Sequence, residues 1–228
     1  YYPDMIPNLS TCKSPQQMFG AVAKSYWAEK MGVDPKNIVM VSIMPCTAKK
    51  FEIRRPDEAA NGMPDVDYAL TTRELGRMID MADIRFLDLP DEEFDSPLGT
   101  GTGAAVIFGA TGGVMEAALR TAVETITGET LGKLDFTEVR GVEGVKEASY
   151  TVGDLNVKVA VASGLANART LLEKVKRGEA DYHFIEIMGC PGGCVNGGGQ
   201  PQVPYGIRNF VDIRAERAKV LYNLDKNN

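Results

Sequence analysis

Residues 184–201 read FIEIMGCPGGCVNGGGQP, and this stretch is the most specific in the chain. The apolar run Phe184–Met188 belongs to a predicted strand. Cys190 and Cys194 follow it, separated by three residues of which two are glycine, and three more glycines stand at 197–199. Glycine loses much conformational entropy on folding, so glycines at this density indicate that the backbone must pack closely against something.

The segments that precede this stretch place it in an α/β fold. Residues 146–152 and 156–162, on either side of a Gly-Asp turn, predict a β-hairpin. A helical pattern over 164–178 then connects the hairpin to a strand at 182–188. Strand, helix and strand in this order form a β-α-β unit, and the sequence therefore predicts the α/β class.

The amino-terminal part contains another strand that ends at a cysteine. Residues 37–44, NIVMVSIM, are rich in β-branched side chains and predict a buried strand. Pro45-Cys46 follow directly, so Cys46 lies just past the carboxyl end of a strand, where open α/β sheets bind ligands. Around this strand the sequence predicts a helix from a Ser14 cap to Gly32, a polar connection over 49–55, a short strand at 67–70, and a helix capped by Thr71 or Thr72 that ends at Ile79.

The remaining segments predict loops and two further helices. Residues 88–103 are acidic and rich in Pro and Gly, and their glycine spacing fits neither a dinucleotide fingerprint nor a P-loop. Helices are expected from about Met115 to Ile126 and over 209–222. We interpret residues 1–228 as one α/β domain that is incomplete at both ends, because the chain starts without Met and stops just after a helical pattern.

Composition excludes several classes of protein. The chain has 31 acidic and 25 basic residues and a net charge of -6, which argues against a general nucleic-acid binder. Its apolar runs are only a few residues long, so no transmembrane helix is expected, and no signal peptide is visible. A hydrophobic fraction of 44% with 25% charged residues is typical of a globular protein.

The four cysteines, at positions 12, 46, 190 and 194, are too few for a disulfide scaffold in 228 residues. Their number alone would suit one cubane iron–sulfur cluster, whose sulfides accept hydrogen bonds from glycine-rich backbone. Zinc is the competing metal, but zinc-binding cysteine pairs commonly have two intervening residues, and a second close pair is absent from the sequence. His183, the one histidine, lies in an apolar strand, which favours a structural role over metal binding or a catalytic triad.

Two longer motifs make the chain recognisable. Met44–Glu52 (MPCTAKKFE) and Glu186–Pro201 closely resemble the second and third signature segments of [FeFe], or iron-only, hydrogenases. Leu9-Ser10, Lys13–Gln17 and Ile107–Gly113 also resemble this family, so the likeness covers nearly the whole chain. It implies mixed twisted sheets flanked by helices, in a truncated catalytic domain whose first signature segment, with adjacent cysteines, would lie before Tyr1.

The resemblance implies an H-cluster, a [4Fe–4S] cubane joined through a cysteine sulfur to a two-iron unit with CO, cyanide and dithiolate ligands. Carried over by position, Cys46 and Cys190 would bind the cubane, while Cys194 would bind it and bridge to the two-iron unit. The fourth ligand would belong to the first signature segment, so Cys12 matches no ligand position. With three of the four ligands, the chain is not expected to assemble the cluster or turn over hydrogen by itself.

The same resemblance implies roles for residues around the two-iron unit. Lys49 would direct its ammonium at a cyanide ligand, and Glu52 would brace the loop with a charged hydrogen bond. Ser10 matches a serine of the family's proton path. The wall of the pocket would come from Ser14, Gln16, Met44, Pro45, Phe108, Gly109 and Met188.

The implied reaction is the reversible reduction of protons to H2 by an enzyme that exchanges electrons with ferredoxin or a similar carrier. Hydrogenase maturation proteins would load its cofactor, and an oxygen-sensitive enzyme of this kind is expected in the cytoplasm. One alternative is a hydrogenase-like protein that holds or delivers ordinary Fe–S clusters, and another is a hydrogenase-like redox sensor. The carrier class departs from the family at Lys49 and at the Gly-Gly-Gly-Gln-Pro run, both intact here, whereas the sensor shares more of the motifs.

Overall fold

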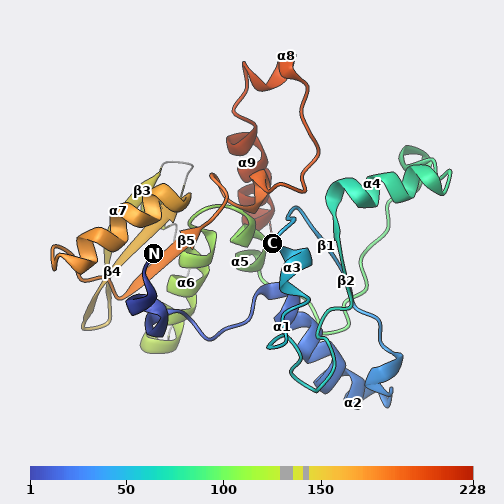
Figure 1. The fold of residues 1–228 in the computed structure, drawn as a ribbon, viewed down its shortest axis with the longest axis horizontal. Helices are drawn as coiled ribbons and strands as arrows, with labels where there is room; N and C mark the ends of the chain where they lie inside the picture. The colour runs from blue at the N-terminus through green and yellow to red at the C-terminus, as the bar shows by residue number, and fades with distance from the viewer. Residues whose placement is uncertain (129–135, 141–143, 228) are drawn as a thin grey trace. The chain divides into compact units, whose positions relative to one another are not determined.

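The computed structural model describes residues 1–128, 136–140 and 144–227, and the chain divides into two compact units. The first unit is Tyr1–Gly99 and the second is Thr100–Asn228. Each has its own sheet and its own helices, which Figure 1 shows as a ribbon coloured along the chain. Both units combine strands with flanking helices, so the α/β class predicted from the sequence is confirmed.

The sheet of the first unit has two parallel strands, β1 (Val41–Met44) and β2 (Tyr68–Thr71). The sequence predicts both strands, but the predicted burial of β1 is wrong. Val41 is 47% exposed and Ile43 is 41% exposed, whereas the alternate residues Ser42 and Met44 are half-buried. Tyr68, the partner of Val41, is also exposed, so in the described part of this unit the sheet is covered mainly on one face.

The helices before β1 follow one another without a break. α1 (Pro15–Val22) continues through a π-helical turn, η2 (Ala23–Trp27), into α2 (Ala28–Met31). Gly32 ends this run in the left-handed conformation, with φ 65°, as the sequence predicts. The short 3-10 helices of this unit are η1 (Pro3–Asn8), η3 (Pro35–Asn37) and η4 (Phe86–Asp88).

The helices next to β2 follow from local sequence signals. α4 (Thr72–Met81) begins with a capping box, in which the Glu74 N–H donates to Thr71 Oγ1 at 3.2 Å and the Thr71 N–H donates to the Glu74 carboxylate at 2.8 Å. Lys50 and Thr71 lower the pKa of Glu74 to about 2 through their hydrogen bonds to its carboxylate. The predicted polar connection over 49–55 is wrong at its start, because good helix formers there form the turn α3 (Lys49–Glu52).

The sheet of the second unit has three strands in the order β3-β4-β5. β3 (Val145–Val152) and β4 (Leu155–Ser163) form the predicted antiparallel hairpin, and β5 (Phe184–Met188) pairs parallel to β4. α7 (Leu165–Lys176) connects β4 to β5. The predicted β-α-β unit is therefore confirmed, and the sheet is mixed.

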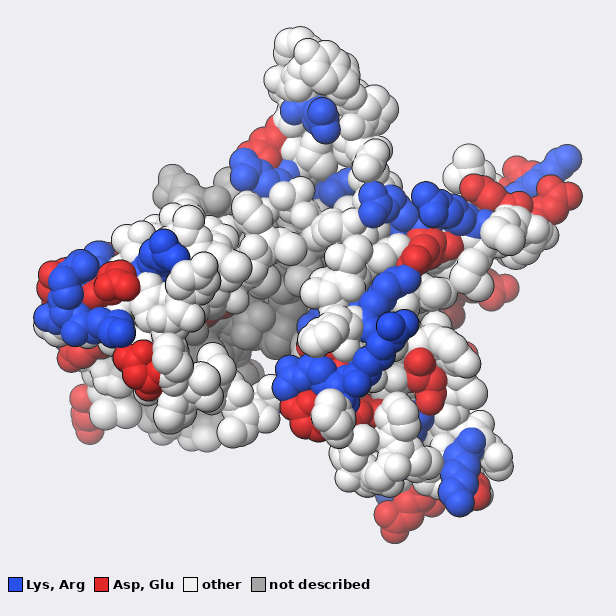
Figure 2. Space-filling model, in the orientation of Figure 1, with Lys and Arg blue, Asp and Glu red and all other residues white. Residues whose placement is uncertain are grey.

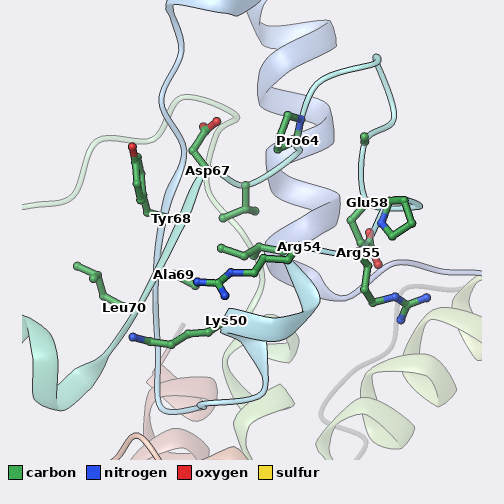
Figure 3. A pocket seen from close by; sticks show the side chains of 13 residues that line it. Lys50, Arg54, Arg55, Glu58, Pro64, Asp67, Tyr68, Ala69 and Leu70 are labelled. Carbon is green, nitrogen blue, oxygen red and sulfur yellow. The ribbon is translucent and has the colours of Figure 1, made fainter.

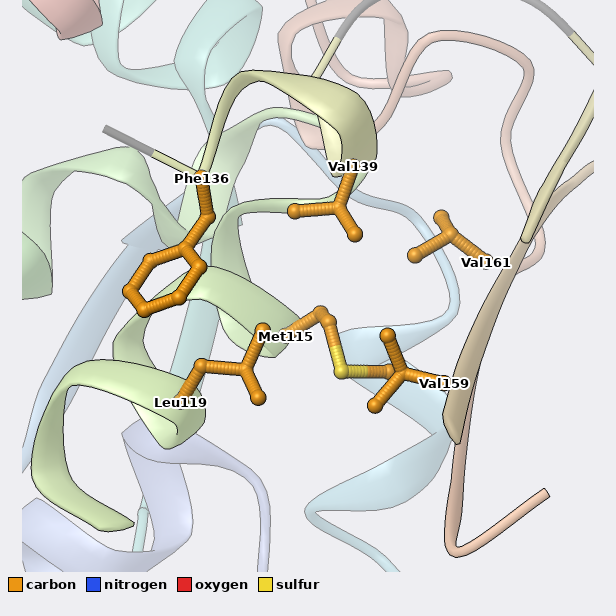
Figure 4. Packing of buried hydrophobic residues seen from close by; sticks show 6 residues of the cluster. All are labelled: Met115, Leu119, Phe136, Val139, Val159 and Val161. Carbon is orange, nitrogen blue, oxygen red and sulfur yellow. The ribbon is translucent and has the colours of Figure 1, made fainter. Parts of the chain in front are cut away.

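Helices cover both faces of this sheet, and β4 alternates between them. Val159 and Val161 belong to a buried cluster with Met115 and Leu119 of α6 (Gly113–Thr127), shown in Figure 4. The intervening residues of β4 pack against α7 on the other side, in a second buried cluster made by Ala160, Ala162, Ala168 and Leu171. β4 is thus buried on both faces. Its parallel neighbour β5 leads into the loop over 189–197 that carries Cys190 and Cys194, which we call the cysteine loop.

The last helix begins later than the sequence predicts. α9 runs over Ile213–Asn227, and the Asp212 carboxylate accepts the N–H groups of Arg214 at 3.0 Å and Ala215 at 3.3 Å. This cap sets the start of α9 and separates it from the short helix α8 (Tyr205–Arg208). In the described ranges of the chain, every helix is too short or too polar to cross a membrane. The other short elements of the second unit are α5 (Gly103–Val106), η5 (Ile107–Gly109), η6 (Thr137–Val139) and η7 (Cys194–Asn196).

Candidate metal centre

The three predicted ligands are half-buried cysteines that form no disulfide, and each lies in a segment that follows a strand. Cys46 follows β1 in the first unit, whereas Cys190 and Cys194 follow β5 in the second. Cys12 is exposed. No three His, Cys, Asp or Glu side chains of the described residues are grouped closely enough to hold a metal ion. One thiol belongs to the first unit and two to the second, so neither unit alone provides three of the predicted ligands.

Glu52 is the centre of a hydrogen-bond network in the first unit. Its carboxylate accepts hydrogen bonds from Ser14 Oγ at 2.6 Å, from Gln16 Nε2 at 2.7 Å and from Lys49 Nζ at 2.7 Å. Ser42 on β1 donates in turn to Gln16 Oε1 at 2.6 Å. The structure thus brings together four residues that the sequence assigns to one pocket, although their predicted roles toward a cofactor stay predictions.

The network explains the charge state of Glu52. Burial by itself would raise the pKa of this carboxyl group, but the hydrogen bonds from Lys49, Ser14 and Gln16 outweigh burial and hold the pKa below its ordinary value. Ser14 occupies the cap position of α1 as predicted, yet its hydroxyl binds Glu52 and not the backbone of the helix. The carboxylate therefore stays ionised and fixes the ammonium of Lys49, three residues after Cys46.

In the second unit, the cysteine loop is hydrogen-bonded to the end of β4 and to the turn before α6. The Gly192 N–H donates to Ser163 Oγ at 2.8 Å, and the Thr111 N–H donates to the Gly192 carbonyl at 3.2 Å. Within the loop, the Gly193 N–H donates to the Cys190 carbonyl at 2.9 Å. Backbone hydrogen bonds of this kind hold the segment that carries the two thiols on a defined turn.

Backbone conformation and close packing within the chain explain why this loop has glycine at positions 192 and 193. Gly192 and Gly193 have φ values of 86° and 101°, a region that other L-residues rarely adopt. A Cβ atom at Gly193 would lie 2.7 Å from the Gly109 carbonyl oxygen and 2.7 Å from the Thr111 nitrogen. Close packing of two protein loops thus requires Gly193, whereas the sequence alone suggests a cofactor as the reason.

Glu186 is a buried residue that the sequence patterns leave without a role. It lies in β5, is 6% exposed, and accepts the N–H groups of Gly112 and Met115 at 2.7 Å each. Burial raises the pKa of its carboxyl group, and the bonds from the backbone of α6 oppose that rise. A single charged residue inside an otherwise apolar strand is the sequence signal that would have indicated it.

The other predicted residues divide between the two units. Ser10 is exposed, and its hydroxyl oxygen accepts the Cys12 N–H at 3.2 Å. His183 is exposed, and its Nδ1 accepts the Lys158 N–H at 3.1 Å. The remaining predicted residues are half-buried, with two in the first unit and three in the second: Met44 and Pro45, then Phe108, Gly109 and Met188.

A pocket of about 700 Å³ in the first unit is separate from these residues. It is lined by parts of α3, β2 and the segment between them, and Figure 3 shows Lys50, Arg54 and Arg55 around it. Lys and Arg side chains also gather on the surface over α3 in Figure 2. None of the predicted site residues lines this pocket, and its cations do not bind metal, so it is not the metal centre.

Comparison with known proteins gives the family. The family model described as "Iron only hydrogenase large subunit, C-terminal domain" matches residues 1–198. The chain belongs to the iron-only hydrogenase large-subunit family. It is 55% identical over 217 residues to the periplasmic [Fe] hydrogenase large subunit of Nitratidesulfovibrio vulgaris, with 95% of this chain and 51% of that protein covered.

Further members of the iron-only hydrogenase family show the same similarity. The NADP-reducing hydrogenase subunit HndD of Solidesulfovibrio fructosivorans is 54% identical over 98% of this chain and 37% of its own length. A solved structure of the [FeFe]-hydrogenase HydA1 from Chlamydomonas reinhardtii matches with a TM-score of 0.77 and 44% identity, and covers 98% of this chain and 62% of that one. The chain thus spans about half or less of the length of these curated relatives.

A related branch of proteins is also similar to the chain. The cytosolic iron-sulfur assembly component 3 of Pongo abelii is 34% identical over 88% of this chain and 43% of its own length. Proteins named as hydrogenases and proteins named as iron–sulfur assembly components are therefore both similar to this chain. Only the side chains of the candidate site can distinguish the two functions.

The donor chemistry of each cysteine segment, taken by itself, fits an iron–sulfur cofactor. Thiolates are soft ligands that favour iron–sulfur clusters, zinc or Cu(I) over Mg²⁺ and Ca²⁺. The Cys190–Cys194 turn includes backbone N–H groups on glycines, and the Cys46 segment includes an ammonium fixed by Glu52. These are the partners that an anionic metal–sulfur cluster would need.

Proposed function

We propose that this chain is the core of the catalytic domain of an [FeFe] hydrogenase, which reversibly reduces protons to H2 with electrons from ferredoxin or a similar carrier. The observation that carries the proposal is the Lys49 ammonium, bound to Glu52 at 2.7 Å and three residues after Cys46. A fixed cation three residues after a proposed metal ligand would hold an anionic terminal ligand such as cyanide, which a cubane bound by thiolates alone does not carry.

In this proposal, the three half-buried cysteines bind the H-cluster. Cys46, Cys190 and Cys194 would hold its [4Fe–4S] part, and Cys194 would also bridge to the two-iron unit with its CO, cyanide and dithiolate ligands. When bound, this cofactor would supply the electron store and the metal site for hydrogen chemistry. The fourth thiolate would come from a part of the parent protein outside these 228 residues.

The other residues would bind, exclude water and move protons. Lys49 would hold an anionic ligand by charge and hydrogen bonding, with Ser14 and Gln16 keeping Glu52, and so Lys49, in place. Met44 and Met188 would shield the cofactor from water with polarizable, apolar side chains. The exposed hydroxyl of Ser10 would exchange protons with solvent.

The second candidate function is iron–sulfur cluster assembly, without hydrogen turnover. It is supported by the 34% identity to the assembly component of Pongo abelii. Identities of 54% and 55% to hydrogenase subunits, together with the fixed Lys49, favour the enzyme. We also propose hydrogenase maturation proteins as partners and the cytoplasm as the compartment, although the similar protein of Nitratidesulfovibrio vulgaris is periplasmic.

The test uses the complete parent protein, produced without oxygen and together with hydrogenase maturation proteins. We expect H2 evolution from reduced ferredoxin in the wild type. We expect less than about 1% of that rate after Lys49→Ala, because the ligand-orienting charge is lost. Lys219→Ala, which removes an exposed lysine from α9, is the matched control and should keep the wild-type rate. A wild-type protein that binds iron but evolves no H2 would support the assembly function instead.

A further inference from the structure

Two buried polar side chains meet the cysteine loop and its neighbouring turn in the second unit. Ser163 is the last residue of β4 and is 3% exposed, and Glu186 lies in β5 and is 6% exposed. β4 and β5 are hydrogen-bonded parallel neighbours, so both side chains belong to the same end region of the sheet. Buried polar groups are costly unless they are hydrogen-bonded, and these two have well-defined partners.

Glu186 holds the start of α6. One carboxylate oxygen accepts the Gly112 N–H and the other accepts the Met115 N–H, each at 2.7 Å. These donors are among the backbone groups that a helix leaves unpaired in its first turn, where a negative charge is also favoured. Because both oxygens are used, the carboxylate fixes the direction in which the 109–113 turn enters α6.

Ser163 connects that turn to the cysteine loop. Its Oγ accepts the Gly192 N–H at 2.8 Å and lies 3.4 Å from Thr111 Oγ1, while the Thr111 N–H donates to the Gly192 carbonyl at 3.2 Å. The absence of a Cβ at Gly193 lets the two loops approach each other. A chain of contacts therefore runs from Glu186 through the 109–113 turn to the loop between Cys190 and Cys194.

We propose that Glu186 and Ser163 are positioning residues that set the geometry of the Cys190–Cys194 loop before any metal binds. We call this pair the loop clamp. The clamp acts through the backbone of the two loops, because its hydrogen bonds go to the N–H groups of Gly112, Met115 and Gly192. Its role toward a cluster rests on the proposed hydrogenase function, whereas its role in ordering the loop does not.

The first experiment therefore uses the metal-free parent protein and measures hydrogen exchange by mass spectrometry. We expect Glu186→Gln to accelerate exchange about tenfold in peptides covering 109–115 and 189–197, because the amide has one acceptor oxygen for two donors. Ser163→Ala should accelerate exchange in the peptide covering 189–197. Glu147→Gln, which removes an exposed carboxylate on β3 that binds Lys174, is the matched control. Unchanged exchange in both loops for both clamp variants would overturn the proposal.

Exchange in the β3 peptide 145–152 separates a local effect from unfolding, since it should stay at the wild-type rate. If Glu186→Gln also accelerates exchange in peptide 145–152, the test rests on the milder substitution Ser163→Ala. The proposal then requires that Ser163→Ala accelerate exchange in peptide 189–197 and leave exchange in peptide 145–152 unchanged.

The second experiment uses the matured parent protein and measures the midpoint potential of its cubane and the infrared bands of its CO and cyanide ligands. Folded Glu186→Gln protein should show a shifted potential or shifted bands, and the Glu147→Gln control should show neither. A wild type without such bands would contradict the proposed function while the exchange data still test the clamp. A third result is a wild type that shows CO and cyanide bands while the clamp variants match it in potential, bands and exchange rates. That result would contradict the role of the clamp and leave the proposed function intact.

Discussion

The amide of Gln16 donates a hydrogen bond to the carboxylate of Glu52 at 2.7 Å, across 36 positions of the sequence. This bond ties the start of α1 to α3 and orients the oxygen atoms of Glu52. The second oxygen then binds Lys49. The position of the Lys49 ammonium, three residues after Cys46 in the sequence, therefore depends on side chains from two distant segments, and this dependence can be measured.

Replacement of Glu52 by Gln should destabilise the fold. The change removes the ion pair with Lys49 and weakens the bonds from Ser14 and Gln16. We expect a loss of about 1.5–3 kcal/mol in the free energy of unfolding at neutral pH, measured by urea denaturation of the parent protein. Glu92→Gln, in the exposed segment after α4, should stay within about 0.5 kcal/mol. Equal effects of the two substitutions would contradict the role of the network.

The contribution of Glu52 should also depend on pH. The folded state lowers its pKa below the ordinary value of 4.5, so its stabilising effect is complete above the unfolded pKa and is lost as the pH falls through the lower, folded pKa. The difference in unfolding free energy between wild type and Glu52→Gln should therefore be constant near neutral pH and shrink below pH 4.5. Urea titrations at a series of pH values measure it, and a difference that grows on acidification would be inconsistent with the network.

Gly193 should tolerate substitution much less well than another left-handed glycine. Alanine at 193 would combine a φ of 101° with a Cβ atom 2.7 Å from the Gly109 carbonyl oxygen. Gly178, after α7, has a φ of 69° and open space around its Cβ position. We expect Gly193→Ala to cost about 3 kcal/mol or more and Gly178→Ala about 1 kcal/mol, measured by urea denaturation. Similar costs would show that the loops do not pack as described.

The cysteines should differ in their effect on iron content. Cys46→Ala removes a predicted ligand that is half-buried after β1, whereas Cys12→Ala removes an exposed thiol that matches no ligand position. Reconstituted parent protein should lose cubane absorbance and iron after Cys46→Ala and retain both after Cys12→Ala. Loss of iron in the Cys12→Ala variant would show that Cys12 is a cluster ligand and would contradict this assignment.

Local signals in the sequence predict much of the fold. Thr71 and Glu74 form the capping box that starts α4, and the Gly153 turn forms the predicted hairpin. These features depend on residues that are close together in the sequence. Features that depend on tertiary contacts escape this reasoning: an apolar run cannot show that Val41 lies on the open face of a two-stranded sheet, and a helical period cannot show that Asp212 delays α9.

The candidate site is predictable only in part, for the same physical reason. The Cys190–Cys194 pair is conspicuous from chemistry and spacing, whereas the choice of Cys46 over Cys12, and the role of Gln16, are indicated only through the resemblance to a family. Nothing in the sequence connects Ser163 to Gly192, because the hydrogen bond between them spans 29 positions. The glycines of the loop show that close packing is needed, but only the structure shows that the 109–111 backbone meets Gly193.

Infrared spectroscopy of the matured parent protein tests the central claim most directly. The account predicts bands of metal-bound CO and cyanide in the wild type, and their loss after Cys194→Ala, because that thiol would join the two-iron unit to the cubane. A wild-type protein that contains a cubane but shows no such bands, after maturation that loads a known hydrogenase in parallel, would contradict the assignment of this chain to hydrogen chemistry.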